Sequence, residues 1–192
     1  SLAFHSDYHV IALNQRGHGD SDWNKDGDYS LDTNIPDIEG FVKKLGLENI
    51  VLIGHSMGAR NSMVFASRNP KVVSKLVLVD MAPETERDEI DTIAGWRRLP
   101  ERADTFEEFI DAALAINSRR TREQLKGSLS HQLRLYPDGK WSWKWDQALR
   151  RADTNGWGPD ILWEHVEKIK MPTILILGSE SNLISPITAR KM

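Results

Sequence analysis

The chain has 192 residues, of which 40% are hydrophobic, and this fits one globular domain, or one domain with an insertion. The formal net charge is −3 with both signs mixed along the chain, which argues against binding to nucleic acid or to an anionic membrane surface. The absence of cysteine excludes disulfides, thiolate nucleophiles and cysteine-ligated zinc.

No stretch approaches the roughly 18 to 20 consecutive apolar residues of a membrane span. We therefore expect a soluble protein, with the cytoplasm as the default location. The first residues carry no basic region, no apolar signal core and no initiating methionine, so we expect them to come from the middle of a longer chain.

The first segments alternate between a strand-like run, a loop and a helical pattern. His9–Leu13 is rich in β-branched residues and predicts a buried strand, which ends in the polar, glycine-rich loop Gln15–Asp22. In 31–45 the apolar residues recur every three or four positions, and Gly46 stands where a helix would stop. This spacing predicts an amphipathic helix in which Pro36 is tolerable only near the first turn.

The alternation continues on both sides of a long middle segment. Asn49–Gly54 is a continuous apolar run, typical of a parallel strand that helices cover on both faces. Residues 59–68 return to helical spacing, and Lys75–Val79 predicts another strand. Further on, 160–169 predicts a helix and Pro172–Leu177 a strand. Alternating strands and helices indicate α/β architecture with a mostly parallel sheet and flanking helices.

The middle segment has a different character, because arginine and glutamate become dense and helical periodicity dominates without a strand-like apolar run. It predicts a helical cap, or lid, with helices over about 88–96, 105–115 (Thr105 as N-cap) and 121–135, followed by a turn at 137–139. The predicted division is an α/β core in 1–85 and 159–192, with the helical cap insertion in 86–158.

Three tryptophans alternate after the predicted turn. Trp141, Trp143 and Trp145 would all face one side of an extended segment. That side could line a substrate pocket, or it could pack the cap onto the core; the sequence leaves both open.

The strongest chemical signal is Gly54-His-Ser-Met-Gly58, which fits the pattern G-x-S-x-G. It lies between a predicted strand and a predicted helix, the context in which the pattern forms a nucleophile elbow. There Ser56 is the candidate nucleophile, the flanking glycines avoid collisions with the neighbouring strand and helix, and the Met57 amide supplies half of an oxyanion hole.

Together with Gln15-Arg-Gly-His-Gly-Asp-Ser21 and Leu76-Val-Leu-Val-Asp-Met-Ala-Pro83, this motif resembles the α/β-hydrolase superfamily over nearly the whole chain. The resemblance implies that the strands here are the fourth to seventh of eight. It also implies that the second oxyanion amide and the catalytic histidine belong to segments outside this sequence. None of the six histidines offers a convincing substitute, so we expect these 192 residues alone to be inactive.

The acid of the catalytic triad is a choice between two strand ends. In the family it usually follows the seventh strand, but that place is Ser181 here, and the nearest carboxylate, Glu180, is one position early. Some members instead carry the acid after the sixth strand, where this chain has Asp80. Asp80 is therefore the preferred acid, with Glu180 as the alternative. Asp20 and Asp22 are expected only to shape their loop.

The resemblance implies a serine hydrolase that cleaves carboxylic esters or thioesters by acyl transfer and needs no metal or organic cofactor. A carbon–carbon bond hydrolase, a lactonase or a perhydrolase would use the same elbow, and a non-catalytic relative that binds a small ligand is the rival from another class. Serine at the elbow argues against dehalogenases and epoxide hydrolases, which attack with aspartate. The expected partner is a small ester or acyl substrate; the oligomeric state stays open.

Overall fold

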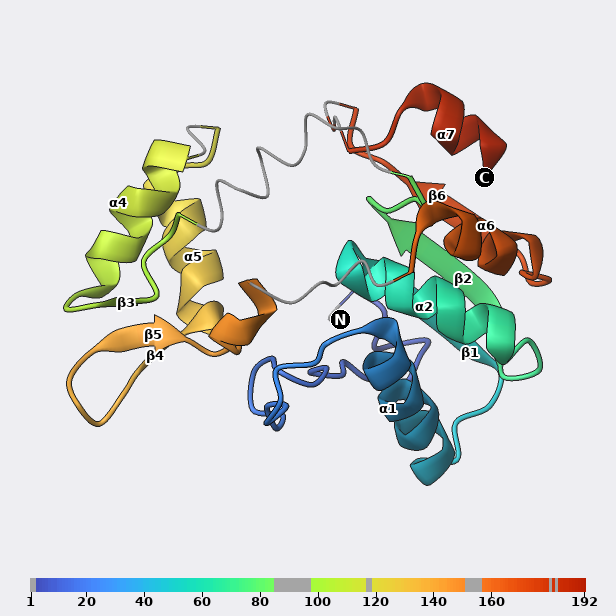
Figure 1. The fold of residues 1–192 in the computed structure, drawn as a ribbon, viewed down its shortest axis with the longest axis horizontal. Helices are drawn as coiled ribbons and strands as arrows, with labels where there is room; N and C mark the ends of the chain where they lie inside the picture. The colour runs from blue at the N-terminus through green and yellow to red at the C-terminus, as the bar shows by residue number, and fades with distance from the viewer. Residues whose placement is uncertain (1–2, 85–97, 117–118, 151–156, 180, 182) are drawn as a thin grey trace.

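The computed structural model describes residues 3–84, 98–116, 119–150, 157–179, 181 and 183–192. Its centre is a three-stranded parallel sheet in the order β1-β2-β6, formed by β1 (Ile50–His55), β2 (Val73–Val79) and β6 (Thr173–Ile176). These strands lie where the sequence predicts them, and the α/β fold class with a parallel sheet and flanking helices is confirmed (Figure 1).

The register of this sheet brings the carboxyl ends of its strands to one edge. His55 pairs with Val79, and Val79 pairs with Ile176, so the last residues of all three strands are level. The residues that follow the strands, Ser56 and Asp80 among them, therefore start from neighbouring points. This is the edge at which open α/β sheets carry their ligand sites.

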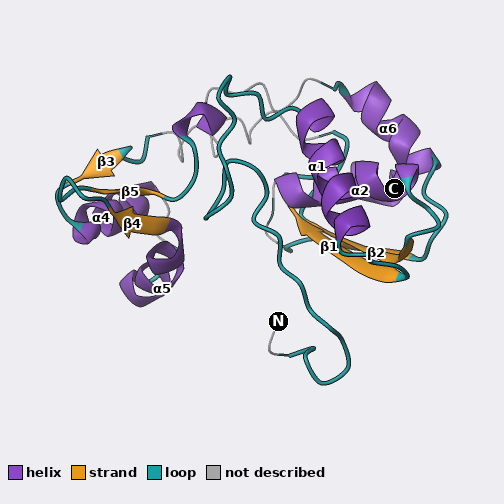
Figure 2. Ribbon diagram, turned by 90° about the horizontal axis from the view of Figure 1, so that it is seen from below, coloured by secondary structure: helices purple, strands orange, loops and turns teal. Residues whose placement is uncertain are grey.

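Helix α2 (Met57–Arg68) packs against the sheet, and α1 (Leu31–Lys44) and α6 (Pro159–Glu167) pack against α2. Figure 2 shows them on the same side of the strands. The core between them is apolar, and the larger side chains in it that are no more than 1% exposed are Ile35, Met63, Val64, Phe65, Leu76 and Leu78. Every helix in the described part of the chain is too short or too polar to cross a membrane.

The predicted end of α1 is confirmed. Gly46 has a φ of 61°, and the amides of Gly46 and Leu47 donate to the carbonyls of Lys43 and Val42 at 3.2 and 3.0 Å. This pair of bonds closes the helix in the manner that favours glycine after the last turn. Pro36 lies inside α1 and beyond its first turn, so the expected limit on its position is wrong.

The other face of the sheet is open. Val51, Ile53, Ile174 and Ile176 point to it and are 38–57% exposed. Helices on both faces were expected, but within the described residues the helices contacting the sheet leave this apolar face uncovered. Because successive side chains of a strand point to opposite faces, apolar residues on this face as well as on the helix-covered face make β1 and β6 continuous apolar runs in the sequence.

The predicted strand at His9–Leu13 is wrong. This segment pairs with no strand of the described chain, and Val10, Ile11 and Leu13 are 38–40% exposed. Its β-branched composition favours extended backbone, but a strand also needs a hydrogen-bonded neighbour.

The insertion contains helices and, against expectation, a small sheet. Helices α4 (Phe106–Ile116) and α5 (Arg122–Gln132) lie apart from the parallel sheet in both views, beside an antiparallel sheet in the order β3-β5-β4 (Figures 1 and 2). Its strands are β3 (Arg102–Ala103), β4 (Leu133–Leu135) and β5 (Trp141–Trp143). The helix expected to continue to residue 135 therefore ends at Gln132, because Leu133–Leu135 pairs with β5. The helix expected over 88–96 lies outside the described residues.

Two local predictions in the insertion are confirmed. Thr105 caps α4: its amide donates to Glu108 Oε1 at 2.9 Å, and the Glu108 amide donates to Thr105 Oγ1 at 3.4 Å. The turn at 137–139 joins β4 to β5, with Gly139 at a φ of 78° and the Tyr136 amide bonded to the Lys140 carbonyl at 2.9 Å.

The tryptophans serve the insertion's own core. Trp143 is 2% exposed, and its ring meets Phe109 of α4 edge to face at 5.3 Å. Trp145 lies 5.2 Å from Trp143, and Trp141 packs on Phe106 at the same distance. These contacts fit neither interpretation left open by the sequence, a substrate pocket or packing of the cap onto the core, because the rings pack within the insertion itself.

The insertion is tied to the loop before α1. The buried Tyr29 hydroxyl donates to Asp146 Oδ2 at 2.5 Å and accepts from the Asn24 amide at 3.0 Å. The Asp146 amide donates to the Gly17 carbonyl at 2.8 Å. Asp146 directly precedes a short 3-10 helix, η1 (Gln147–Arg150), so the contact lies where β5 leads out of the insertion. The last helix of the chain is α7 (Pro186–Lys191).

Candidate active site

Ser56 occupies a strained turn between β1 and α2. Its φ is 52° and its ψ −119°, values that a residue with a side chain rarely adopts. The turn is held by three backbone bonds: the Ser56 amide donates to the Val79 carbonyl at 2.9 Å, and the Ser56 carbonyl accepts from Ala59 and Arg60 at 2.9 and 3.1 Å. Strain that is fixed so firmly is typical of functional positions. The side chain is exposed at the strand edge.

The two glycines of the motif have different roles. A Cβ on Gly54 would lie 2.3 Å from the Gly58 carbonyl oxygen and 2.6 Å from Ala59 Cα, so no side chain fits between β1 and α2. A Cβ on Gly58 would meet only Gln15 Nε2, at an ordinary 3.7 Å. The expectation that both glycines avoid a collision is therefore right for Gly54 and wrong for Gly58.

Met57 is the first residue of α2, so its amide has no acceptor within the helix. The positive end of the helix dipole lies at the same place. The amide is adjacent to Ser56 in the chain, which fits the predicted oxyanion donor.

Asp80 follows β2 at the position level with Ser56, and it too has a positive φ, of 53°. Its amide donates to the Ile176 carbonyl at 2.8 Å, and its carboxylate Oδ1 accepts from Ser181 Oγ at 2.8 Å. The structure thus brings Asp80 and Ser181, the two strand-end positions weighed for the acid, into direct contact. Glu180, the alternative acid, lies outside the described residues.

All six histidines lie in the described residues, and none of them hydrogen-bonds Ser56 or Asp80 there. His165 is buried, and its Nδ1 lies 2.6 Å from Ser67 Oγ. Burial lowers the pKa of His165, as do Arg68 and Lys168 nearby. The His18 ring contacts the Arg16 carbonyl at 3.1 Å. His5, His9, His55 and His131 are exposed.

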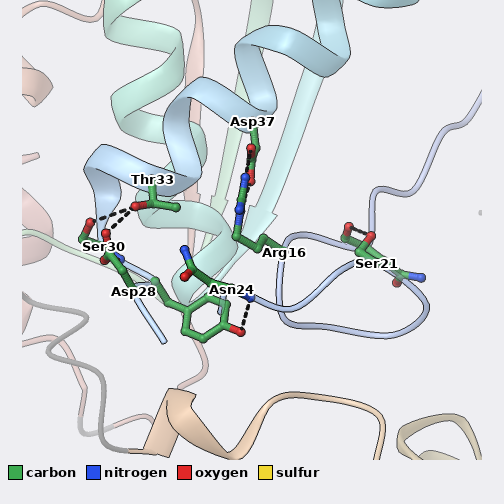
Figure 3. A network of polar contacts seen from close by, with 9 residues as sticks. Arg16, Ser21, Asn24, Asp28, Ser30, Thr33 and Asp37 are labelled. Atoms are coloured by element: carbon green, nitrogen blue, oxygen red, sulfur yellow. Dashed lines mark hydrogen bonds and ion pairs between the residues drawn. The ribbon is translucent and has the colours of Figure 1, made fainter. Parts of the chain in front are cut away.

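The glycine-rich loop is fastened to the helices beside the elbow. Asn61 of α2 donates to Gln15 Oε1 at 2.5 Å, and Arg16 makes a two-pronged ion pair with Asp37 of α1 at 2.6 and 2.7 Å (Figure 3). Sequence reasoning missed Gln15. Its place beside Arg16 in the Arg-Gly-His-Gly segment was the available signal, but its partner is 46 residues away.

The two loop aspartates differ in role. The Asp22 carbonyl accepts from the Gly17 amide at 3.0 Å, which closes the turn as expected. Asp20 instead pairs with Arg134 of β4, so its expected role in shaping the turn is wrong: it links the loop to the insertion.

Comparison with known proteins gives one family and many relatives. The family model described as alpha/beta hydrolase fold matches residues 1–192. The chain is 26% identical to Esterase Rv0045c of Mycobacterium tuberculosis over 186 residues, which cover 92% of this chain and 59% of that protein. It is 27% identical to the 3-hydroxybutyrate-oligomer hydrolase of Cupriavidus necator, covering 97% of this chain and 68% of that protein.

Solved structures share the fold. The crystal structure of E-2-(acetamidomethylene)succinate hydrolase superposes with a TM-score of 0.85 at 22% identity, covering 99% of this chain and 70% of that one. The crystal structure of Rv0045c superposes with a TM-score of 0.74 at 24% identity, covering 92% and 59%. The chain thus spans between about three fifths and about two thirds of the length of the two curated relatives described here.

Proposed function

Because the chain belongs to the alpha/beta hydrolase fold family, we propose that it carries the nucleophile and the acid of a serine hydrolase that cleaves carboxylic esters or thioesters. The observation that carries this proposal is the pair of strained residues, Ser56 and Asp80, at the level ends of adjacent parallel strands. The relatives named as hydrolases and an esterase support a hydrolase of this fold.

In the proposed reaction Ser56 Oγ attacks the carbonyl carbon while an imidazole takes its proton. The carbonyl oxygen becomes an oxyanion, which the Met57 amide stabilises. The intermediate then collapses, the bond to the alkoxide or thiolate breaks, and the leaving group takes the proton from the imidazolium. Water repeats the sequence on the acyl-enzyme and releases the acid and Ser56.

We place the imidazole and the second oxyanion donor outside these 192 residues, because none of the six histidines hydrogen-bonds Ser56 or Asp80 in the described chain. Asp80 would hold that imidazole in the useful tautomer and stabilise its charged form. The 192 residues by themselves are accordingly proposed to be inactive.

Residues 86–158 are proposed to act as a cap that selects the substrate. Their described part has its own hydrophobic cluster, and its Asp146 is bonded to Tyr29, just before α1, and to Gly17 of the glycine-rich loop. Lactonase, perhydrolase, carbon–carbon bond hydrolase and ligand-binding alternatives share the same elbow, and the cap distinguishes them.

The test is turnover of a short-chain p-nitrophenyl ester by the full-length protein. Asp80→Asn should keep the fold and KM and lower kcat by about 10⁴, if the loss matches that of the equivalent change in the well-studied triad. Glu180→Gln is the matched control and should change little. The reverse ranking would assign the acid to the end of β6 and contradict the choice of Asp80.

A further inference from the structure

Ser181 stands where the family's acid is usually found, yet it carries no charge, and its hydroxyl lies 2.8 Å from Asp80 Oδ1. The same hydroxyl oxygen accepts from the Leu183 amide at 3.3 Å. The Ser181 amide in turn donates to the Gly178 carbonyl at 3.0 Å, which closes a turn directly after β6. The Ser181 hydroxyl is therefore hydrogen-bonded both to its own loop, at Leu183, and to the Asp80 carboxylate.

The direction of the Ser181 hydroxyl follows from these partners. An amide can only donate and an ionised carboxylate can only accept, so the single hydroxyl proton goes to Asp80. Asp80 is also bound to this edge through its backbone, because its amide donates to the Ile176 carbonyl of β6 at 2.8 Å. Both bonds attach the end of β2 to β6 and its following loop, and they fix where the carboxylate lies.

We propose that Ser181 is a positioning residue for Asp80: its hydroxyl holds Oδ1 and leaves Oδ2 to receive the N–H of the imidazole. This deepens the proposed function and rests on Asp80 being the acid. The serine occupies the family's usual acid position with a donor instead of a second carboxylate. Two carboxylates at this distance would repel, and one would stay protonated.

The proposal has a signature that a merely structural role lacks. A hydroxyl that only filled space could be replaced by another side chain of similar size, whereas a hydroxyl that holds Oδ1 can be replaced only by another hydroxyl. A loss of kcat at unchanged KM, restored by threonine, is therefore the signature of positioning.

The experiment compares Ser181→Ala, Ser181→Thr and Ser179→Ala in the full-length protein, with a p-nitrophenyl ester as substrate. Ser181→Ala should lower kcat about 10- to 100-fold, the range of one hydrogen bond to a charged group, with KM unchanged. Ser181→Thr keeps a hydroxyl and should restore kcat. Ser179 is an exposed neighbour with no side-chain hydrogen bond within the described chain, so Ser179→Ala should match the wild type.

Thermal melting of each variant checks the fold, and Ser181→Cys, which keeps the size but is a weak donor, replaces the alanine variant if that one unfolds. A wild-type kcat in Ser181→Ala would overturn the proposal. So would a lower kcat that threonine does not restore. Asp80→Asn separates this failure from a failure of the proposed function. Full activity in Asp80→Asn would show that Asp80 is not the acid of the triad.

Discussion

At the scale of single residues, the elbow depends on one glycine more than on the other. Only Gly54 faces backbone atoms within contact distance, whereas the space beside Gly58 is open to a methyl group. The motif predicts that both glycines are needed, because a sequence pattern states which residues occur and not how closely a neighbouring element approaches them. Ser56 was predictable for the opposite reason: its role depends on the strand and helix directly beside it in the chain.

Gly54→Ala should destabilise the protein strongly, since its methyl group would force β1 and α2 apart; overpacking of this kind costs about 1–3 kcal/mol or more. Gly58→Ala should be neutral or stabilise by up to about 1 kcal/mol, because Gly58 lies within α2 and alanine favours helix. Urea unfolding of both variants measures the difference. An equal loss of unfolding free energy in the two variants would show that the space around Gly58 is tighter than described.

The contact of Ser181 with Asp80 could not be read from the sequence. The two residues are 101 positions apart, and their meeting depends on the register of β2 against β6. The sequence showed that a charge was absent at position 181 and present at position 80. It did not show that the two side chains share one hydrogen bond.

At the scale of elements, the prediction succeeded where a pattern is long enough to show a period and failed where a strand is short or lacks a partner. The three- and four-residue spacing of 31–45 predicted α1 to within one residue of its end at Lys44. The strands of the insertion have only two or three residues each, too few to show a period, and β3 pairs with a strand far along the chain, Arg102 with Ser142. His9–Leu13 failed in the other direction, because strand-like composition does not supply a partner.

The attachment of the insertion to the segment before α1 centres on Tyr29. Burial raises the pKa of the Tyr29 hydroxyl to about 12 from an ordinary value of 10, and its bond to Asp146 acts in the same direction. Because the folded pKa is the higher one, the stabilisation from this hydroxyl is complete below pH 10 and is lost as the pH rises through 12.

Tyr29→Phe should therefore destabilise the protein at pH 7, since Asp146 loses a donor, by about 1.5–3 kcal/mol. The difference in absorbance at 295 nm between the wild type and Tyr29→Phe, followed with rising pH, isolates the Tyr29 phenolate. It should appear near pH 12. Phenolate appearing near 10 would mean that this hydroxyl is not buried against Asp146.

At the scale of the whole molecule, the open face of the parallel sheet sets how the 192 residues behave alone. Ile53 and Ile174 are both 57% exposed there, beside Val51 and Ile176. Exposed apolar faces and unpaired strand edges promote association. The chain expressed alone should elute as aggregates and bind a hydrophobic dye, and Ile53→Thr with Ile174→Thr should reduce the dye signal. A monomer that melts sharply and binds no dye would contradict this.

The account as a whole depends on Ser56 as the nucleophile. The most direct measurement treats the full-length protein with a fluorophosphonate and locates the adduct by tandem mass spectrometry. We expect one adduct, on the peptide that contains Ser56, and none in Ser56→Ala, with the melting temperature of that variant unchanged. An adduct on another residue, or labelling that persists in Ser56→Ala, would contradict the account.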